Sequence, residues 1–183
     1  MNKSKKQLIT FLADKQMNED FYYFNIEINN KMTGVKVPNV NFIGEENDKS
    51  VQKLFDLMIN KPLLIYRFGE IKCNSCFETE IKELQREFDD NPSLVCILCS
   101  YWSNLEFHNF KRFNRINFPL YRIDKDAFEW EIENNGNPYY FILHQNMKIS
   151  HIYVPNKAYP ELSKQYLEGV KRFLSDKDKK LEN

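Results

Sequence analysis

The sequence predicts a single α/β domain whose central mixed, mostly parallel sheet is flanked by helices. Segments of strand length alternate with segments of helical periodicity along most of the chain, which is the order found in parallel α/β folds. Two strand segments, residues 63–68 and 93–100, are apolar almost throughout, as expected of central strands buried on both faces. The chain has 183 residues, about the length of one domain.

We expect residues 1–34 to form an extension that precedes the domain and contains one helix and one strand. The helical spacing of apolar side chains predicts a helix over residues 4–17, and the alternation of apolar with polar residues predicts a strand over 24–28. The domain then spans residues 35–175. Its first segment is extended and contains Pro38, which restricts any strand there to a sheet edge.

The remaining elements follow from apolar periodicity and from turn residues. A helix is predicted over residues 50–60, and nine elements follow in the order β-α-β-α-β-α-β-β-α. The final β-β unit is a hairpin, which adds antiparallel strands to the sheet. Residues 176–183 are rich in charge and are expected to form a flexible tail. The nine elements are predicted at residues 63–68, 77–88, 93–100, 104–115, 118–123, 126–133, 139–143, 148–154 and 162–173.

The composition argues against several classes of function. Lys and Arg number 26, as do Asp and Glu, so the net charge is zero and gives no bulk attraction to nucleic acid or to an anionic membrane. Only 5 glycines occur, and none of the glycine-rich phosphate-binding motifs is present. No apolar run reaches the ~18 residues needed to span a membrane. The 4 cysteines are too few for a disulfide scaffold, which makes their spacing informative.

The first cysteine pair, Cys73-Asn74-Ser75-Cys76, lies between a predicted buried strand and a predicted helix. A helix N-terminus offers unpaired N–H groups and the positive end of the helix dipole, and both stabilise a thiolate. The pKa of the first cysteine of such a pair can therefore fall from about 8.5 towards ~7 or lower. We expect Cys73 to be the nucleophile and Cys76 to be the thiol that resolves a mixed disulfide with a partner.

The second pair, Cys96 and Cys99, completes the spacing C-x₂-C-x₁₉-C-x₂-C, which also fits a four-cysteine zinc site. Two observations count against zinc. The second pair lies in an apolar segment of strand character, where residues three apart point to opposite faces. The 19 residues between the pairs also include a predicted helix, which would separate the pairs. We expect Cys96 and Cys99 to be buried core residues.

At residues 35–175 the chain resembles thioredoxin-fold proteins, specifically the TlpA/ResA-like thiol–disulfide oxidoreductases and their redoxin relatives. The strand at 63–68 followed by the first cysteine pair resembles the strand and C-x-x-C of that family. The segment beginning Asn137-Pro138-Tyr139 resembles the family's cis-proline segment. The resemblance implies that Pro138 is cis and that Asn137, Pro138 and Tyr139 bind the extended chain of a partner protein.

The chain departs from the family at several positions. Arg67 lies six residues before the first cysteine, where thioredoxins hold a buried acid that assists proton transfer. Among neighbouring acids, Glu70, Glu78 and Glu80 are candidates to replace it. The tryptophan common beside the first cysteine is missing, as is a proline in the following helix.

The expected function is thiol–disulfide exchange with protein substrates, supplied with electrons by an upstream thiol reductant. The pair at residues 73 and 76 is the redox centre, and no metal, organic cofactor or nucleic acid is expected. An alternative is a binding module whose first cysteine pair is a structural or vestigial disulfide. A peroxiredoxin-like peroxidase ranks lower, because residues 67–72 lack the Pro and Thr of the usual peroxidatic motif.

The resemblance also bears on localisation. Members of the family mostly act outside the cytoplasm, often tethered to a membrane through a leader. We therefore favour the periplasm or cell envelope, with a leader removed and any tether lying outside this sequence, over the cytoplasm.

Overall fold

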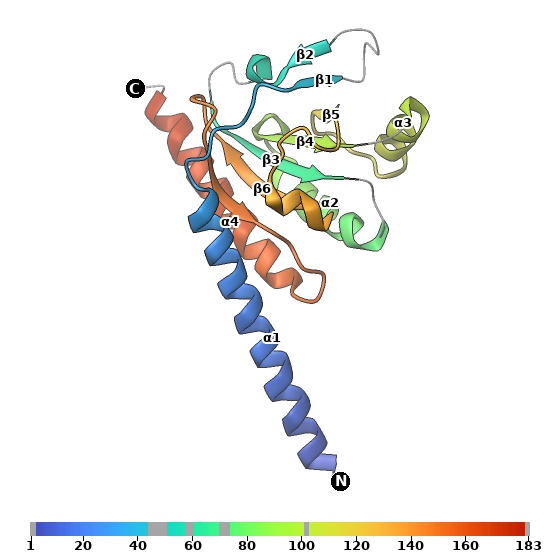
Figure 1. Ribbon diagram of the computed structural model, residues 1–183, viewed down its shortest axis with the longest axis vertical. Coiled ribbons are helices and arrows are strands. Elements are labelled where there is room, and N and C mark those ends of the chain that lie inside the picture. Colours follow the sequence, from blue (N-terminus) through green and yellow to red (C-terminus); the bar gives the residue numbers. More distant parts are fainter. Residues whose placement is uncertain (1–2, 44–50, 58–60, 70–73, 101–102, 182–183) are drawn as a thin grey trace.

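The structure is a computed structural model in which seven strands form one mixed sheet in the order β2-β1-β5-β4-β3-β6-β7 (Figure 1). It describes residues 3–43, 51–57, 61–69, 74–100 and 103–181. The strands are β1 (Asn41–Ile43), β2 (Val51–Lys53), β3 (Leu63–Phe68), β4 (Val95–Cys99), β5 (Leu120–Arg122), β6 (Tyr139–Leu143) and β7 (Ile149–Tyr153). The α-helices are α1 (Lys3–Met32), α2 (Asn74–Phe88), α3 (Asn104–Phe113) and α4 (Pro160–Leu181), and the 3₁₀ helices are η1 (Leu54–Leu57), η2 (Pro92–Leu94) and η3 (Glu131–Asn135).

The thioredoxin-like core of the sheet follows the predicted order of elements. Strands β3, β4 and β5 are parallel neighbours, and β4 and β5 are each reached through a helical crossover, because parallel strands need such a connection. Strands β6 and β7 form the antiparallel hairpin predicted at the end of the domain. The remaining pairings, β3 with β6 and β1 with both β2 and β5, are also antiparallel, so the sheet is mixed but less parallel than predicted.

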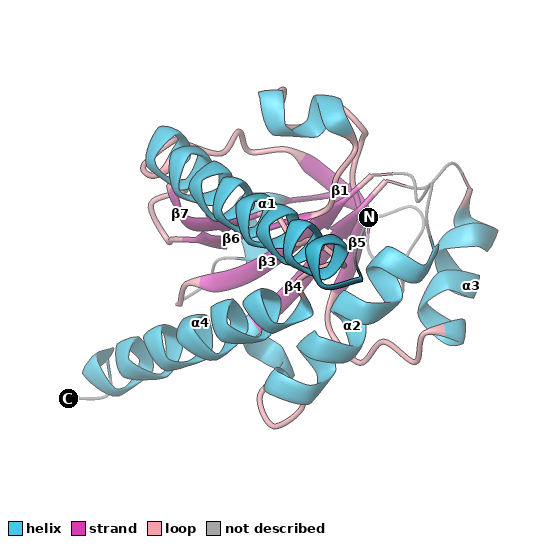
Figure 2. Cartoon of the chain, turned by 90° about the horizontal axis from the view of Figure 1, so that it is seen from below, coloured by secondary structure: helices cyan, strands magenta, loops and turns pink. Residues whose placement is uncertain are grey.

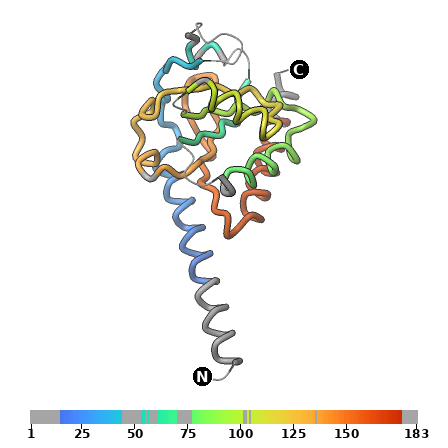
Figure 3. Tube along the Cα trace, turned by 90° about the vertical axis from the view of Figure 1, so that its right-hand side faces the viewer, coloured from blue at the N-terminus to red at the C-terminus, as the bar shows by residue number. Residues whose placement is uncertain are grey.

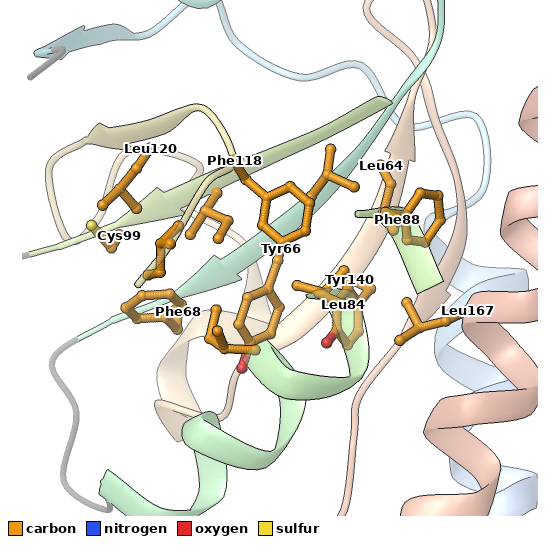
Figure 4. Close-up of a cluster of buried hydrophobic side chains, with 14 of the residues drawn as sticks. Leu64, Tyr66, Phe68, Leu84, Phe88, Cys99, Phe118, Leu120, Tyr140 and Leu167 are labelled. Atoms are coloured by element: carbon orange, nitrogen blue, oxygen red, sulfur yellow. The ribbon is translucent and has the colours of Figure 1, made fainter. Parts of the chain in front are cut away.

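Two apolar cores lie on opposite faces of the sheet. Helices α2 and α4 lie together on one face (Figure 2), where they enclose the larger core with α3. Figure 4 shows this core, in which aromatic side chains of β3 and β6 pack against leucines of the helices; it includes Leu64, Tyr66, Phe68, Leu84, Phe88, Cys99, Phe118, Leu120, Tyr140 and Leu167. The second core lies on the other face, beneath the end of α1, the segment after it and the loop that leads into η3. Each fully buried Leu, Ile or Phe stabilises the fold by about 1.5–3 kcal/mol.

The strand predicted over residues 24–28 is wrong, because α1 continues as a helix to Met32. Phe21, Ile28 and Met32 recur at spacings of seven and four and pack against the domain, so the helical period dominates. The alternation that predicted a strand arises from apolar residues that lie in solvent instead. Phe24 and Ile26, two of the residues that formed the alternation, are 41% and 39% exposed. The N-terminal extension therefore consists of one helix, which runs away from the sheet towards the N-terminus (Figure 3).

Helix α1 is attached along β7, the edge strand of the sheet, by two asparagines one turn apart. Asn25 accepts a hydrogen bond from the Val154 N–H (2.7 Å) and donates one to the Val154 C=O (3.3 Å). Asn29 accepts from the Ile152 N–H (3.0 Å). Gly34, at φ 86°, then turns the chain so that its own N–H bonds the Ile149 C=O (2.7 Å). Main-chain groups of β7 that would otherwise be unpaired at a sheet edge are thus satisfied within the chain.

Three further segments differ from their predictions. Residues 50–60 are predicted as one helix, but Val51–Lys53 pair with β1 as a strand and Leu54–Leu57 form a helical turn, while residues 50 and 58–60 lie outside the described residues. Residues 126–133 were also predicted as a helix, yet the regular turn begins at Glu131. Helix α4 extends to Leu181, into the segment predicted to be a flexible tail.

Candidate functional site

The described backbone flanks the first cysteine pair as the sequence predicts. Strand β3 ends at Phe68, and α2 begins at Asn74. Cys73 lies outside the described residues, whereas Cys76 belongs to the first turn of α2, which contains no acidic residue. Cys76 is therefore a first-turn residue of a 15-residue helix, and Cys73 directly precedes that helix in the sequence. That position favours an anionic thiolate over a neutral thiol.

Arg67, the next-to-last residue of β3, is a buried cation at this end of the sheet. Its side chain is only 2% exposed, and it is held by five hydrogen bonds. The Nε donates to Glu133 Oε1 (2.8 Å), and one terminal nitrogen donates to the Phe68 C=O (2.7 Å) and to Ser100 Oγ (2.9 Å). The other terminal nitrogen donates to main-chain carbonyl groups of residues 124 and 125 (3.4 and 3.0 Å). One guanidinium thus joins the ends of β3 and β4 to two loops.

The Arg67–Glu133 ion pair also reaches β6. Arg67 and Tyr139 are directly paired across β3 and β6, and the Tyr139 hydroxyl donates to the same oxygen, Glu133 Oε1 (3.1 Å). Burial, reinforced by the charge of Glu133, raises the pKa of Tyr139 well above its usual value of 10.0, so the hydroxyl stays protonated and acts as a donor. The sequence carried one signal of this network, a single arginine in an otherwise apolar strand segment.

Glu80 is the buried carboxyl group of α2, four residues after Cys76. It is 2% exposed and accepts hydrogen bonds from the Tyr140 hydroxyl (2.9 Å) and from Ser163 Oγ (3.0 Å). Burial raises the pKa of Glu80 above its usual 4.5, although both hydrogen bonds act in the opposite direction. Of the three acids considered as replacements for the family's buried acid, Glu78 is exposed and Glu70 lies outside the described residues. Glu80 is thus the one with a buried environment in the described structure.

Cys96 and Cys99 are core residues, as predicted. Both are buried on β4, but Cys96 belongs to one apolar core and Cys99 to the other, on opposite faces of the sheet. The Cys99 thiol lies 3.5 Å from the Tyr121 C=O, within the distance of a weak S–H hydrogen bond. Burial raises the pKa of both thiols far above their usual 9.0. Because the two sulfur atoms face apart, they cannot bind one zinc ion together.

The segment proposed to bind a partner begins at an exposed residue and enters the core within two positions. Asn137 is exposed, Pro138 is half-buried, and the side chain of Tyr139 is buried. Every described peptide bond is trans, including the one before Pro138, so the cis proline implied by the resemblance is not found. Gly136, at φ 65°, ends η3 and turns the chain into β6, and the trans form is the one that X–Pro bonds ordinarily adopt. Partner contacts here would therefore involve Asn137, Pro138 and main-chain groups, because the Tyr139 side chain faces inward.

An apolar cleft of about 400 Å³ lies beside Asn137 and was not anticipated from the sequence. One wall is the inner side of α1, and the other is the segment from Glu129 to Ile132, which leads into η3. Trp130 stacks on Phe128 (centroids 4.6 Å apart) and contacts Phe141 edge-on (5.6 Å), leaving it half-buried at the cleft. The residues that line the cleft are far apart in the sequence and meet only in the folded chain. No local sequence motif predicts the cleft.

Two searches of the described residues gave negative results. No helix among them is long and apolar enough to cross a membrane. No group of three or more His, Cys, Asp or Glu side chains in the described ranges is placed to hold a metal ion.

Comparison with solved structures gives the fold a family context. A thiol:disulfide interchange protein from Bacteroides sp. is similar at 15% identity and a TM-score of 0.59, over 78% of this chain and 90% of the other. The thioredoxin domain of a thiol-disulfide oxidoreductase from Bacteroides vulgatus is similar at 14% identity and a TM-score of 0.57, over 78% of this chain and 97% of the other. A mutant of PrxQ from Xylella fastidiosa is similar at 18% identity and a TM-score of 0.56, over 77% of this chain and 96% of the other.

No protein-family model and no curated protein sequence matches the chain. The structural neighbours are thus thioredoxin-fold thiol–disulfide oxidoreductases and peroxiredoxins at low identity. They show that the chain has a thioredoxin-like fold with an N-terminal helix added to it.

Proposed function

We propose that this thioredoxin-like chain is a thiol–disulfide oxidoreductase whose redox centre is the pair Cys73 and Cys76. The observation that carries the proposal is the start of α2 at Asn74, immediately after Cys73 and six residues beyond the end of buried β3. A cysteine at a helix N-terminus reacts as a thiolate at neutral pH, and a second cysteine one turn along can close a disulfide with it.

The reaction proceeds by two successive exchanges. The Cys73 thiolate attacks one sulfur of a partner's disulfide, forming a mixed disulfide and releasing the partner's other sulfur as a thiolate. The Cys76 thiolate then attacks the sulfur of Cys73 and releases the partner's second thiolate. The partner has gained two electrons and, from solvent, two protons, while the pair has become a disulfide. An upstream thiol reductant restores the pair by the reverse exchanges.

Two buried charged groups support this chemistry. Arg67, paired with Glu133, places a buried guanidinium at the end of β3, the strand that leads to Cys73. Glu80, one helical turn from Cys76, is a buried carboxyl group whose pKa is raised by burial, and we infer that it exchanges a proton with the resolving thiol. The buried carboxyl group would thus be supplied by α2, while β3 supplies a cation.

The test uses defined disulfides. The Cys76→Ser variant should accumulate a stable one-to-one mixed disulfide with a small disulfide-containing protein, detected by mass spectrometry and reversed by dithiothreitol. Cys73→Ser should form none, and Cys96→Ala, which removes a buried thiol on the other face of the sheet from Cys99, should turn over like the unmodified chain. Failure of Cys76→Ser to form the mixed disulfide, together with no turnover by the unmodified chain, would overturn the proposal.

The reduction potential separates the proposal from a structural disulfide. A potential of about −120 to −270 mV is typical of catalytic pairs, whereas structural bridges usually lie below about −300 mV. A peroxidase is the second candidate, because PrxQ is among the structural neighbours. Consumption of hydrogen peroxide by the reduced chain without disulfide reduction would favour it.

A further inference from the structure

We propose that the cleft beside Asn137 binds the segment of a partner protein that flanks its reactive disulfide, and that this segment carries an apolar side chain next to lysine or arginine. The inference rests on the proposed function, because it names the substrate class of that site. Its structural basis is a built cleft at the end of the chain segment that the family resemblance assigns to partner binding.

The walls of the cleft suit an apolar side chain. Phe24 and Ile28 line it from α1, one turn apart, and Trp130 lines it from the opposite side. Phe24 is 41% exposed, so this wall is open to solvent in the free protein. An apolar side chain inserted between the two walls would bury these surfaces and displace water, which stabilises a complex by roughly 25 cal/mol for each Å² removed from solvent.

The charge at the rim sets the polarity of the partner. Three carboxylates, Glu27, Glu129 and Glu131, line the cleft together with one ammonium group, that of Lys31. Lys31 already pairs with Glu131 across the cleft, and that contact raises the pKa of the lysine and lowers that of the glutamate. Glu27 and Glu129 are exposed, so the rim carries two negative charges in excess. A basic residue beside the inserted side chain meets this charge with a complementary one.

The wall that carries Trp130 is held in place from inside the domain. Glu133, three residues further along the chain, is the residue that Arg67 and Tyr139 both hydrogen-bond. The aromatic stack of Trp130 on Phe128 adds a second attachment. A wall fixed in this way is formed before a partner arrives, so binding does not have to order it. The same arginine lies on β3, the strand that leads to the cysteine pair.

Binding can be tested without any redox chemistry. Fluorescein-labelled peptides of about 12 residues that lack cysteine would carry a central leucine flanked by two lysines, two glutamines or two glutamates. The full chain should bind the lysine peptide most tightly and the glutamate peptide least, by fluorescence polarisation. The double variant Glu27→Gln, Glu129→Gln should bind the lysine peptide about three- to tenfold more weakly than the unmodified chain does, as expected for exposed charge pairs. The difference in affinity between the lysine and glutamate peptides should shrink at high salt.

A matched control removes two carboxylates elsewhere. Glu161→Gln, Glu168→Gln changes the net charge equally on α4 and should leave binding unchanged. Equal binding of the lysine and glutamate peptides, or unchanged binding to the cleft double variant, would overturn the inference. Selective binding combined with no disulfide exchange would instead refute the proposed function, so the two failures are distinguishable. If both hold, lysine peptides that carry a mixed disulfide should show a higher kcat/KM than their glutamate counterparts.

Discussion

The side chain of Asn25 hydrogen-bonds both main-chain groups of Val154, at 2.7 Å to the N–H and 3.3 Å to the C=O. An asparagine amide has the same donor and acceptor as a peptide unit, so Asn25 substitutes for a neighbouring strand at the edge of the sheet. Asn29, one turn later, does the same for the Ile152 N–H. Helix α1 is therefore fastened to the domain by hydrogen bonds that its sequence places at a spacing of four.

Replacing these asparagines should loosen α1 and expose the edge of β7. We expect Asn25→Ala and Asn29→Ala each to lower the free energy of unfolding by about 1–2 kcal/mol, because each leaves main-chain groups without their partner. Amide hydrogen exchange at Ile152 and Val154 should accelerate in the variants. Asn30→Ala, an exposed position on the same helix, is the matched control and should change neither measurement. Equal exchange rates in all three variants would contradict this account of the attachment.

Removing the buried cation Arg67 should lower the free energy of unfolding far more than removing a surface cation. Arg67→Met leaves Glu133, only 12% exposed, without its counter-ion, and we expect a loss of about 3–5 kcal/mol in the free energy of unfolding. Adding Glu133→Gln should recover part of that loss, because the uncompensated charge is then gone. Lys164→Met, which removes an exposed pair with Glu168, should cost less than about 1 kcal/mol. Urea denaturation of the four proteins measures these differences.

Glu80 should make stability depend on pH in the weakly acidic range. Its pKa in the folded protein lies above the usual 4.5, so between these two values the folded chain binds more protons than the unfolded one. Stability contributed by this group is then present below 4.5 and is lost as pH rises through the folded pKa. Glu80→Gln removes the titration while leaving groups that can bond Tyr140 and Ser163. We expect the unmodified chain to lose stability relative to this variant as pH rises from about 4.5 to 7.

Thermal unfolding at several pH values measures this relative loss. Glu78→Gln, at an exposed position of the same helix, should show the pH profile of the unmodified chain. Parallel profiles for the unmodified chain and Glu80→Gln would show that the carboxyl group titrates normally.

The two cysteine pairs should react differently with a thiol reagent. Burial raises the pKa of Cys96 and Cys99 and also shields them, so neither forms a thiolate in the folded protein. In the reduced, folded chain we expect two of the 4 thiols to react rapidly with Ellman's reagent and all of them after denaturation. Rapid reaction of more than two would contradict the burial of the second pair. A Cys96→Ala, Cys99→Ala variant should keep the fast phase unchanged.

The sequence predicted the elements whose pattern is local. The limits of β6 agree to the residue, because Pro138 and a polar turn bound a fully apolar run. The opposite orientation of Cys96 and Cys99 also follows directly from strand geometry. The helical course of α1 over residues 24–28 could not be predicted in this way. Exposed Phe24 and Ile26 alternate with polar residues as in a strand. The feature that decides is the bonding of Asn25 and Asn29 to residues 154 and 152, more than 120 positions away.

Of the candidate site, the sequence predicts only the cysteine pair, and the chemistry of that pair stays a prediction. The spacing of the first cysteine pair and its place before a predicted helix indicate a redox pair. The role of Arg67 depends on Glu133, 66 residues away, and the cleft depends on α1 meeting the loop that carries Trp130. Such contacts arise from tertiary packing, so no periodicity or motif encodes them.

The position of α1 has a thermodynamic consequence. The same helix seals the margin of β7 through Asn25 and forms one wall of the cleft through Phe24 and Ile28. The cleft exists only when α1 is packed against the domain. Binding of a molecule in the cleft and packing of α1 are therefore linked equilibria. A ligand at 100 times its dissociation constant would stabilise the docked helix by a further ~2.7 kcal/mol, and fraying of the helix would lower the ligand's apparent affinity in proportion to the docked fraction.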